Sequence, residues 1–191
     1  MLGVYEWARL FRISDFGFRI LLMNIALFGF MGTGKSAVAQ ILARRLGLRW
    51  VDMDKVIEAK QGRRIEEIFE KEGEAFFRQI ERDLVQELIK QSDLVISTGG
   101  GVVLDLQNIK DFEKWGLCLC LNADPQIIFD RTRHRKDRPL LKGLDSMKKI
   151  LELLELRQSY YDKIPNQIDT NGKSIHDIVE TILSLIKRTE Q

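Results

Sequence analysis

The sequence is poor in cysteine and carries almost no net charge. It has two cysteines, and 30 lysines and arginines against 28 aspartates and glutamates give a formal net charge of +2. So small an excess supplies no strong field for nucleic acid or an anionic membrane, and we expect neither as a partner. Cys118 and Cys120 lie two residues apart in an apolar run, where a disulfide would be strained. We therefore expect both to be core residues of a reduced, cytoplasmic protein.

The sequence also lacks any long hydrophobic run. No stretch approaches the roughly 20 apolar residues that a membrane-spanning helix requires. Residues 1–22 contain neither the continuous apolar segment nor the small-residue cleavage site of a secretory signal. These residues could form an amphipathic arm, but the folded pattern begins at Met23 without them. We therefore interpret Met23 as the true start and assign no function to residues 1–22.

From residue 23 onward, short apolar runs alternate with longer helical patterns. Buried strands are predicted at residues 24–28, 48–51, 94–97, 117–121 and 167–170. Helical or amphipathic segments are predicted at residues 36–47, 55–60, 64–71, 74–90, 144–161 and 175–187, with one more opening at Asp124 and Pro125. Strands separated by helices of this length pair in parallel through right-handed crossovers. We therefore expect one α/β domain of three layers over residues 23–191, without an internal repeat or a linker.

The strongest motif is Gly-Phe-Met-Gly-Thr-Gly-Lys-Ser at residues 29–36. It matches the pattern G-x-x-x-x-G-K-[ST], after a predicted strand and at the start of a predicted helix. The glycines let successive backbone N–H groups point at an anion, and the helix N-terminus adds its positive dipole end. Lys35 can reach the β- and γ-phosphates, and the Ser36 hydroxyl can ligate Mg²⁺. We interpret the segment as a nucleoside triphosphate site rather than a glycine-rich turn that only closes the connection.

A triphosphate site alone leaves three functions open. A GTPase switch usually carries an Asn-Lys-x-Asp motif that reads guanine, and the sequence has no such tetrapeptide. An ATPase module that drives conformational change usually needs more chain for its partner contacts. A small-molecule kinase needs an acceptor pocket beside the γ-phosphate and a means of excluding water, which is a competing nucleophile. The remaining motifs bear on those two features.

Two carboxylates follow the second predicted strand, in the segment Asp52-Met53-Asp54. The carboxyl ends of strands in a parallel sheet face the ligand crevice, so both carboxylates should lie near the phosphates. They would share one side if the strand extended through Asp54. One carboxylate could then hold a water of the Mg²⁺ shell, while the other accepts a hydrogen bond from an acceptor hydroxyl. The alternative is an Asp that only caps the next helix.

Four further segments can be interpreted structurally or functionally. Arg78 and Glu81 are helical neighbours, which by itself indicates a surface ion pair. The three glycines at residues 99–101 follow a strand and suit a close approach of a ligand, although a flexible strand exit is the alternative. The cationic loop at residues 131–141 favours a lid at around residues 131–143 whose arginines close over triphosphate, because it lacks the interleaved aromatic residues of a nucleic-acid site. Arg157 would ordinarily be a solvated charge near the end of a helix.

Taken together, these motifs resemble those of the shikimate kinase family, in the family's order and over nearly everything from Met23 to the end. The motifs are G-x-M-G-x-G-K-S at residues 29–36, D-x-D at 52–54, G-E-x-x-F-R-x-x-E at 73–81, G-G-G at 99–101, R-P-L-L at 138–141 and R-x-x-x-Y at 157–161. The resemblance implies a fold of the nucleoside monophosphate kinase type with a five-stranded parallel sheet. It also implies transfer of the γ-phosphate of ATP to the 3-hydroxyl of shikimate, on the route to chorismate and the aromatic amino acids. We expect ATP as co-substrate, Mg²⁺ as cofactor and a monomeric enzyme.

The resemblance also implies a role for each matching residue. Asp54 would hold the acceptor hydroxyl, and Asp52 would act in the outer shell of the Mg²⁺ that Ser36 ligates. Two guanidinium groups would grip the shikimate carboxylate, since their forks suit a planar anion. The implied acceptor-binding residues are Asp54, Arg78, Gly99, Gly100, Gly101 and Arg157. The implied nucleotide-binding residues are Gly32, Thr33, Gly34, Lys35, Ser36, Ala37 and Arg131, and those acting on the transferring phosphate are Lys35, Asp54 and Arg138.

The sequence departs from the family pattern in two places. Ala37 stands where the family usually has Thr or Ser, so one hydroxyl contact to the α-phosphate is expected to be missing. The loop at residues 170–174 lacks the proline often found near adenine. Two other functions stay open at this point. One is a related kinase of another small hydroxy acid, such as a gluconate kinase, and the other is a nucleotide-binding regulatory module without catalysis.

Overall fold

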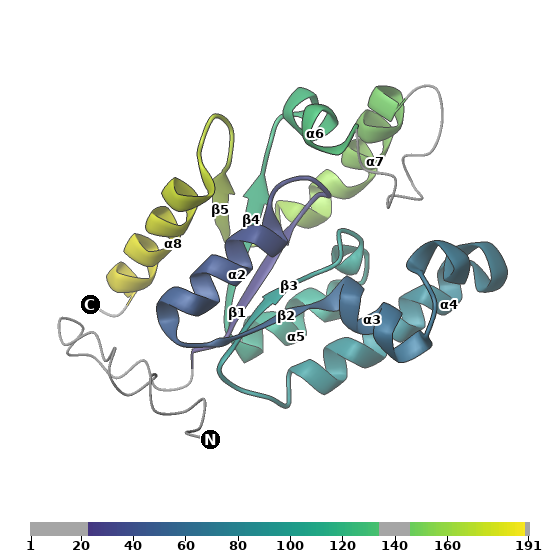
Figure 1. Cartoon of the computed structure of the whole chain (residues 1–191), viewed down its shortest axis with the longest axis horizontal. Coiled ribbons are helices and arrows are strands. Elements are labelled where there is room, and N and C mark those ends of the chain that lie inside the picture. Colours follow the sequence, from purple (N-terminus) through teal and green to yellow (C-terminus); the bar gives the residue numbers. More distant parts are fainter. Residues whose placement is uncertain (1–22, 134–145, 190–191) are drawn as a thin grey trace, which may run out of the picture.

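The computed structural model describes residues 23–133 and 146–189 of the chain (Figure 1). Residues 1–22 and most of the predicted lid, including Arg138, lie outside the described residues. The strands are β1 (Ile25–Gly29), β2 (Arg49–Asp52), β3 (Leu94–Ser97), β4 (Leu117–Asn122) and β5 (Asn166–Asp169). The helices are α2 (Lys35–Leu46), α3 (Met53–Gln61), α4 (Ile65–Leu88), the short 3₁₀ helix η1 (Val102–Leu104), α5 (Leu106–Trp115), α6 (Pro125–Thr132), α7 (Ser146–Tyr161) and α8 (Ile175–Thr189).

The five strands form one parallel sheet in the order β2-β3-β1-β4-β5. The central strand β1 is buried along its whole length, as its continuous apolar sequence predicts for a parallel strand covered on both faces. Alternate residues of β1 enter two different cores. Ile25 and Leu27 pack with α2 and α8, whereas Ala26 and Phe28 pack with α4, α5 and α7. The predicted three-layer fold and its five-stranded parallel sheet are confirmed.

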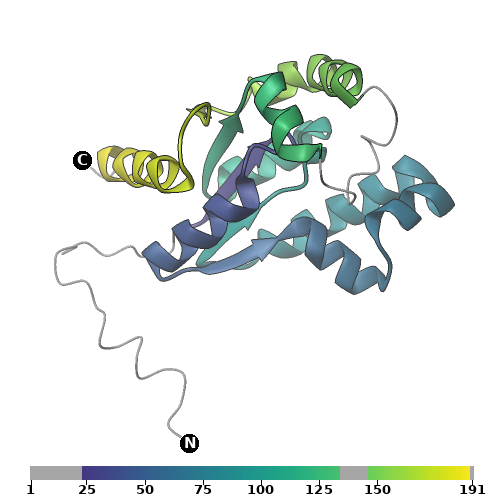
Figure 2. The ribbon, with the colours of Figure 1, turned by 45° about the horizontal axis from the view of Figure 1, so that its top comes forward.

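The order of the strands places a switch point at the carboxyl end of β1. The chain moves from β1 to β2 on one side of the sheet and later returns to β4 on the other side of β1. Ligands bind at such points in open α/β sheets. In Figures 1 and 2, the α3–α4 pair and the α6–α7 pair lie on opposite sides of this end of the sheet.

Helix α4 joins two segments that the sequence predicts as separate helices. Gly73 interrupts it with φ 81° and ψ 175°, a conformation that residues with a side chain rarely adopt. The kink makes α4 a helix with two axes, and its second part begins at Glu74. That second part carries Arg78 and Glu81 toward the sheet.

The sequence did not predict η1 and α5. Asp105 caps α5, because its side chain accepts a hydrogen bond of 2.8 Å from the backbone N–H of Gln107. Ile109 and Phe112 of α5 are buried at helical spacing against the sheet. An Asp followed by this spacing is the signal that could have revealed the helix. The other predicted elements differ from the observed ones by a few residues at their ends.

The two cysteines are free and buried on the same face of β4, as predicted. Burial raises the pKa of both the Cys118 and the Cys120 thiol to about 12, so neither is a reactive thiolate. None of the helices in the described ranges, 23–133 and 146–189, is long and apolar enough to cross a membrane.

Candidate active site

The loop between β1 and α2 has the backbone that an anion-binding nest requires. Gly29, Gly32 and Gly34 all have positive φ, at 134°, 82° and 96°. A Cβ on Gly29 would collide with the carbonyl oxygen of Leu121, and one on Gly32 would lie 2.8 Å from Cγ2 of Thr132. Glycine is therefore required at both positions for conformational and for steric reasons. The loop ends at the N-terminus of α2, whose dipole adds to its attraction for phosphate.

Lys35 and Thr33 hold the loop from within. The Nζ of Lys35 donates hydrogen bonds of 2.8 Å to the carbonyl of Gly29 and 3.0 Å to that of Phe30. The hydroxyl of Thr33 donates to the same Phe30 carbonyl at 2.8 Å. Lys35 is 8% exposed, so its ammonium group lies at the loop rather than in bulk water. This places a positive charge beside the position that the nest prepares for phosphate.

Ser36 and Asp52 bring two oxygen groups together below the loop. The Ser36 hydroxyl donates a hydrogen bond of 2.7 Å to Oδ2 of Asp52. Oδ1 of the same carboxylate accepts from the backbone N–H of Lys55 at 3.3 Å, which makes Asp52 the N-cap of α3. The capping and functional interpretations of Asp52 are therefore compatible. No cluster of three or more His, Cys, Asp or Glu that could hold a metal is found among the described residues. A hydroxyl with one carboxylate nevertheless suits Mg²⁺, which in such sites keeps waters and binds the substrate phosphates.

Asp54 lies in the first turn of α3 rather than on the strand. Strand β2 ends at Asp52, so the shared strand face proposed for the two carboxylates does not exist. The helix turns Asp54 toward the glycine loop after β3 instead. A Cβ on Gly99 would lie 2.8 Å from Oδ1 of Asp54 and 2.9 Å from Oε1 of Glu81. Asp54 is thus brought against residues that are far from it in the sequence.

Arg78 and Glu81 do not form a surface ion pair. The side chain of Glu81 is 2% exposed, and its Oε2 accepts a hydrogen bond of 2.6 Å from Nη1 of Arg78. Burial raises the pKa of Glu81 to about 7, against the opposing effects of Arg78 and Arg157, and the charge of Asp54 adds to the rise. The guanidinium of Arg78 also lies against Gly101, where an added Cβ would collide with both Nη atoms.

Arg157 is not a solvated charge either. It is 4% exposed, and its Nη1 donates to the carbonyl of Gly100 at 3.3 Å. The hydroxyl of Tyr161 donates to the same carbonyl at 2.6 Å, and burial raises the pKa of this phenol above its ordinary value. The Arg157 guanidinium lies over the ring of Phe30 in the phosphate loop, 5.9 Å from its centroid. Arg157 therefore connects the glycine loop to the phosphate loop.

Arg131, at the end of α6, bridges the phosphate loop and the loop after β5. It donates to the Gly32 carbonyl at 3.4 Å, and to the hydroxyl and carbonyl of Thr170 at 3.2 and 3.1 Å. This places Arg131 near the phosphate loop but away from the acceptor residues. Ala37 is half-buried in the first turn of α2.

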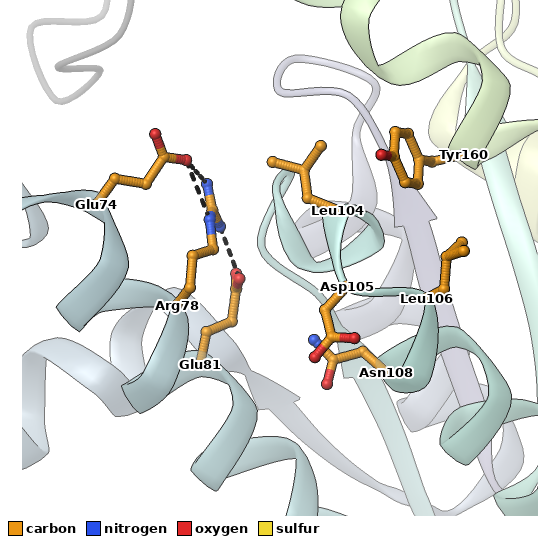
Figure 3. Close-up of a pocket in the computed structure, with 8 residues that line it drawn as sticks. All are labelled: Glu74, Arg78, Glu81, Leu104, Asp105, Leu106, Asn108 and Tyr160. Carbon is orange, nitrogen blue, oxygen red and sulfur yellow. Dashed lines mark hydrogen bonds and ion pairs between the residues drawn. The ribbon is translucent and has the colours of Figure 1, made fainter.

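A cavity of about 580 Å³ adjoins the acceptor residues (Figure 3). Figure 3 shows Arg78 between Glu74 and Glu81 on one side of it, facing residues of η1, α5 and α7. The lining residues are Glu74, Arg78, Glu81, Leu104, Asp105, Leu106, Asn108 and Tyr160. Sequence reasoning assigned Arg78 to the site but gave no role to Glu74, Glu81 or Tyr161. The spacing of Glu74 and Glu81 from Arg78 on one helix was the available signal.

The fold and this site define a P-loop phosphotransferase with a small-acceptor site beside its phosphate loop. The family model for shikimate kinase matches residues 31–187. The chain is 42% identical over 165 residues to the shikimate kinase of Sulfurihydrogenibium sp., covering 86% of this chain and 98% of the relative. It is also 42% identical over 165 residues to the shikimate kinase of Thermodesulfovibrio yellowstonii, covering 86% of this chain and 95% of that relative. The chain belongs to the shikimate kinase family, as its motifs predicted.

Solved structures agree with this assignment. The shikimate kinase from Acinetobacter baumannii in complex with shikimate superimposes with a TM-score of 0.85 at 36% identity, over 88% of this chain and 95% of that one. A gluconokinase from Sinorhizobium meliloti superimposes with a TM-score of 0.56 at 15% identity, over 87% and 93%. At that identity the second likeness shows the fold alone. The chain is therefore an ATP-dependent kinase of the shikimate kinase family, and the gluconate kinase alternative is not favoured.

Proposed function

We propose that this chain transfers the γ-phosphate of ATP to the 3-hydroxyl of shikimate. The observation that carries the proposal is the convergence of Asp54, Arg78 and Arg157 around the glycines at residues 99–101. Gly100 lies against Met31 of the phosphate loop, so an acceptor here would be beside the phosphate to be transferred. A carboxylate to hold a hydroxyl and two guanidinium groups to hold a carboxylate suit a small hydroxy acid.

On the nucleotide side, the residues bind and neutralise charge. The backbone of Gly32, Thr33 and Gly34 and the ammonium of Lys35 would hold the β- and γ-phosphates. Ser36 and Asp52 would hold Mg²⁺, which neutralises the charge that develops on the phosphate oxygens. Arg131 would lie against adenine, and Arg138 would meet the transferring phosphate. Ala37 would approach the α-phosphate without a hydroxyl.

On the acceptor side, the residues position the nucleophile. Asp54 would accept a hydrogen bond from the acceptor hydroxyl and hold it in line with the γ-phosphate. A loose transition state requires little proton removal at the outset, so orientation is the main contribution of Asp54. Arg78 and Arg157 would hold the acceptor carboxylate at the far end of the molecule. We also propose that the enzyme acts as a cytoplasmic monomer, in keeping with its two free, buried cysteines.

The test is ADP release by the purified protein with Mg-ATP, measured with shikimate, gluconate, nucleoside monophosphates or no acceptor. Stimulation by shikimate alone is the expected result. Stimulation by gluconate or a nucleotide instead would keep the phosphate chemistry and reject the acceptor. Bound ATP with no stimulation by any acceptor would favour a regulatory module. A second readout is the molar mass in solution, where a dimer would reject the monomer.

A further inference from the structure

Arg78 already has carboxylate partners on both edges of its guanidinium group (Figure 3). Nη1 donates to Glu81 at 2.6 Å. Nε and Nη2 both donate to Oε1 of Glu74, at 3.2 and 2.8 Å. The edge formed by Nε and Nη2 is one that a carboxylate can bind with two parallel hydrogen bonds. An acceptor carboxylate that uses this edge must therefore replace Glu74.

The two partners of Arg78 differ in their freedom to leave. The side chain of Glu81 is 2% exposed, and that of Glu74 is 59% exposed. A Glu81 carboxylate that left Arg78 would remain as an uncompensated charge in the interior, which is strongly unfavourable. Glu74 can rotate into water and keep its hydration. Glu74 is thus the partner that can be exchanged, and Glu81 is the one that stays.

The charge around Arg78 also favours an exchange. Glu74 and Glu81 already give Arg78 two carboxylate partners. An acceptor carboxylate would bring a third one to the same guanidinium group if nothing left the site. Departure of Glu74 into solvent keeps the number at two. Glu74 lines a cavity of about 580 Å³, which leaves space beside Arg78 for this movement.

We propose that Glu74 is an internal counter-ion that occupies the acceptor-carboxylate position on Arg78 and is exchanged for the carboxylate of the acceptor. Glu74 thereby lowers the affinity for the acceptor and is a determinant of acceptor binding. The proposal rests on the proposed function, because it takes Arg78 as the residue that binds the acceptor carboxylate. The alternative is an exposed ion pair one helical turn apart that has no effect on binding.

The decisive variant is Glu74→Gln, which keeps the size of the side chain and removes its charge. We expect its dissociation constant for shikimate to be about two- to fivefold lower than that of the wild type, the range that an exposed pair supports. Titration calorimetry without ATP measures this constant directly. The KM for shikimate should fall with it, so the gain appears in binding rather than in kcat. The neutral methyl ester of shikimate cannot replace Glu74, so its affinity should not improve.

Two controls separate the exchange from a general effect of charge. Glu72→Gln removes a carboxylate from the same helix, but one that pairs with Arg63 at 3.1 Å and is 41% exposed. It should leave the shikimate affinity at the wild-type value. In an Arg78→Lys background, which lacks the two-nitrogen edge, Glu74→Gln should no longer improve binding.

An unchanged or weaker affinity for shikimate in Glu74→Gln would overturn the proposal. An equal gain for the neutral ester, or in Glu72→Gln, would overturn it as well, because the effect would then be one of overall charge. Failure of the proposed function has a different signature, since the wild type itself would neither bind nor phosphorylate shikimate.

Discussion

The phosphate loop and the proposed acceptor site are neighbours, but they are built in different ways. The loop is the single segment of residues 29–36, and its shape comes from three glycines with positive φ and from hydrogen bonds within the segment. The acceptor site is assembled from α3, α4, α7 and the loop after β3. Its charged groups, Asp54, Arg78 and Arg157, reach the site only because those elements pack together.

This difference indicates where each site is vulnerable. A nest of backbone N–H groups needs little support from the rest of the protein. A set of buried side chains from separate elements depends on the packing of each element, and a displacement of about 1 Å can cost about a hundredfold in rate. Changes on the acceptor side should therefore alter acceptor binding and turnover while nucleotide binding persists.

Asp54→Asn is expected to show the largest difference between its effect on turnover and its effect on nucleotide binding. The amide is a poorer partner for the acceptor hydroxyl, so kcat should fall by about a hundredfold or more. The dissociation constant for Mg-ATP should change less than about twofold, because Asp54 faces the glycine loop after β3. Steady-state kinetics and calorimetry with ATP measure the two effects. Asp52→Asn is the paired variant and should instead raise the Mg²⁺ concentration that the reaction requires. Equal loss of ATP binding and turnover in Asp54→Asn would contradict the division between the two sites.

A somewhat smaller effect is expected for Gly101→Ala. Gly101 has φ −102°, so alanine suits the backbone, but its Cβ would collide with the Arg78 guanidinium. Displacement of Arg78 should lower kcat/KM for shikimate by roughly ten- to a hundredfold, mainly through KM. Gly100→Ala is a matched control, since its Cβ would have only ordinary contacts, 3.5 Å or longer. If both variants retain the wild-type KM, the close approach of Gly101 to Arg78 does not matter for binding.

The buried carboxylate of Glu81, on the acceptor side, should make the free energy of unfolding depend on pH. Its pKa in the folded protein is about 7, above the 4.5 of an unperturbed glutamate, because burial disfavours its charge. The stability that this shift contributes is fully present below about pH 4.5 and is lost as the pH rises through 7. We expect a loss on the order of 1 kcal/mol or more in the free energy of unfolding between pH 5 and 8. Denaturant unfolding measures it, and Glu81→Gln should lose less over the same range.

The smallest effect is expected on the nucleotide side, from Ala37→Ser. A hydroxyl at this position would add one hydrogen bond to the α-phosphate, worth about 0.5–1.5 kcal/mol. The KM for ATP should therefore fall several-fold, while the KM for shikimate stays the same. Initial rates at varied ATP and at varied shikimate separate the two. A change confined to the shikimate KM would contradict the division between the two sites.

Much of the fold could be predicted from the sequence because its signals are local. Continuous apolar runs predicted β1, β3 and β4, and the alternation of strands and helices predicted the parallel sheet. The sequence analysis did not predict helix α5, although Asp105 and the spacing of Ile109 and Phe112 indicate it. The sequence predicted two helices where the structure has the single kinked helix α4. The pattern on each side of Gly73 is helical, and Gly73 itself has a non-helical conformation.

The sequence named the residues of the proposed acceptor site, which the structure brings together, but it did not predict their environment. Arg78 and Arg157 were assigned by resemblance, while the spacing of Arg78 and Glu81 by itself suggested only a surface pair. The near-complete burial of Glu81 and Arg157 depends on what packs over them. The joint approach of Arg157 and Tyr161 to the Gly100 carbonyl connects residues about 60 positions apart, which no local pattern reveals.

The sequence by itself determined the phosphate loop, the strand pattern and the family, because these depend on backbone conformation and on residues close together in the chain. Only the tertiary structure decided which charges are buried and which face water. It made Glu81 a fixed partner of Arg78 and left Glu74 exposed, although both lie within one turn of Arg78 on the same helix. The physical reason is that the cost of a charge depends on its solvation, and solvation is a property of the whole fold.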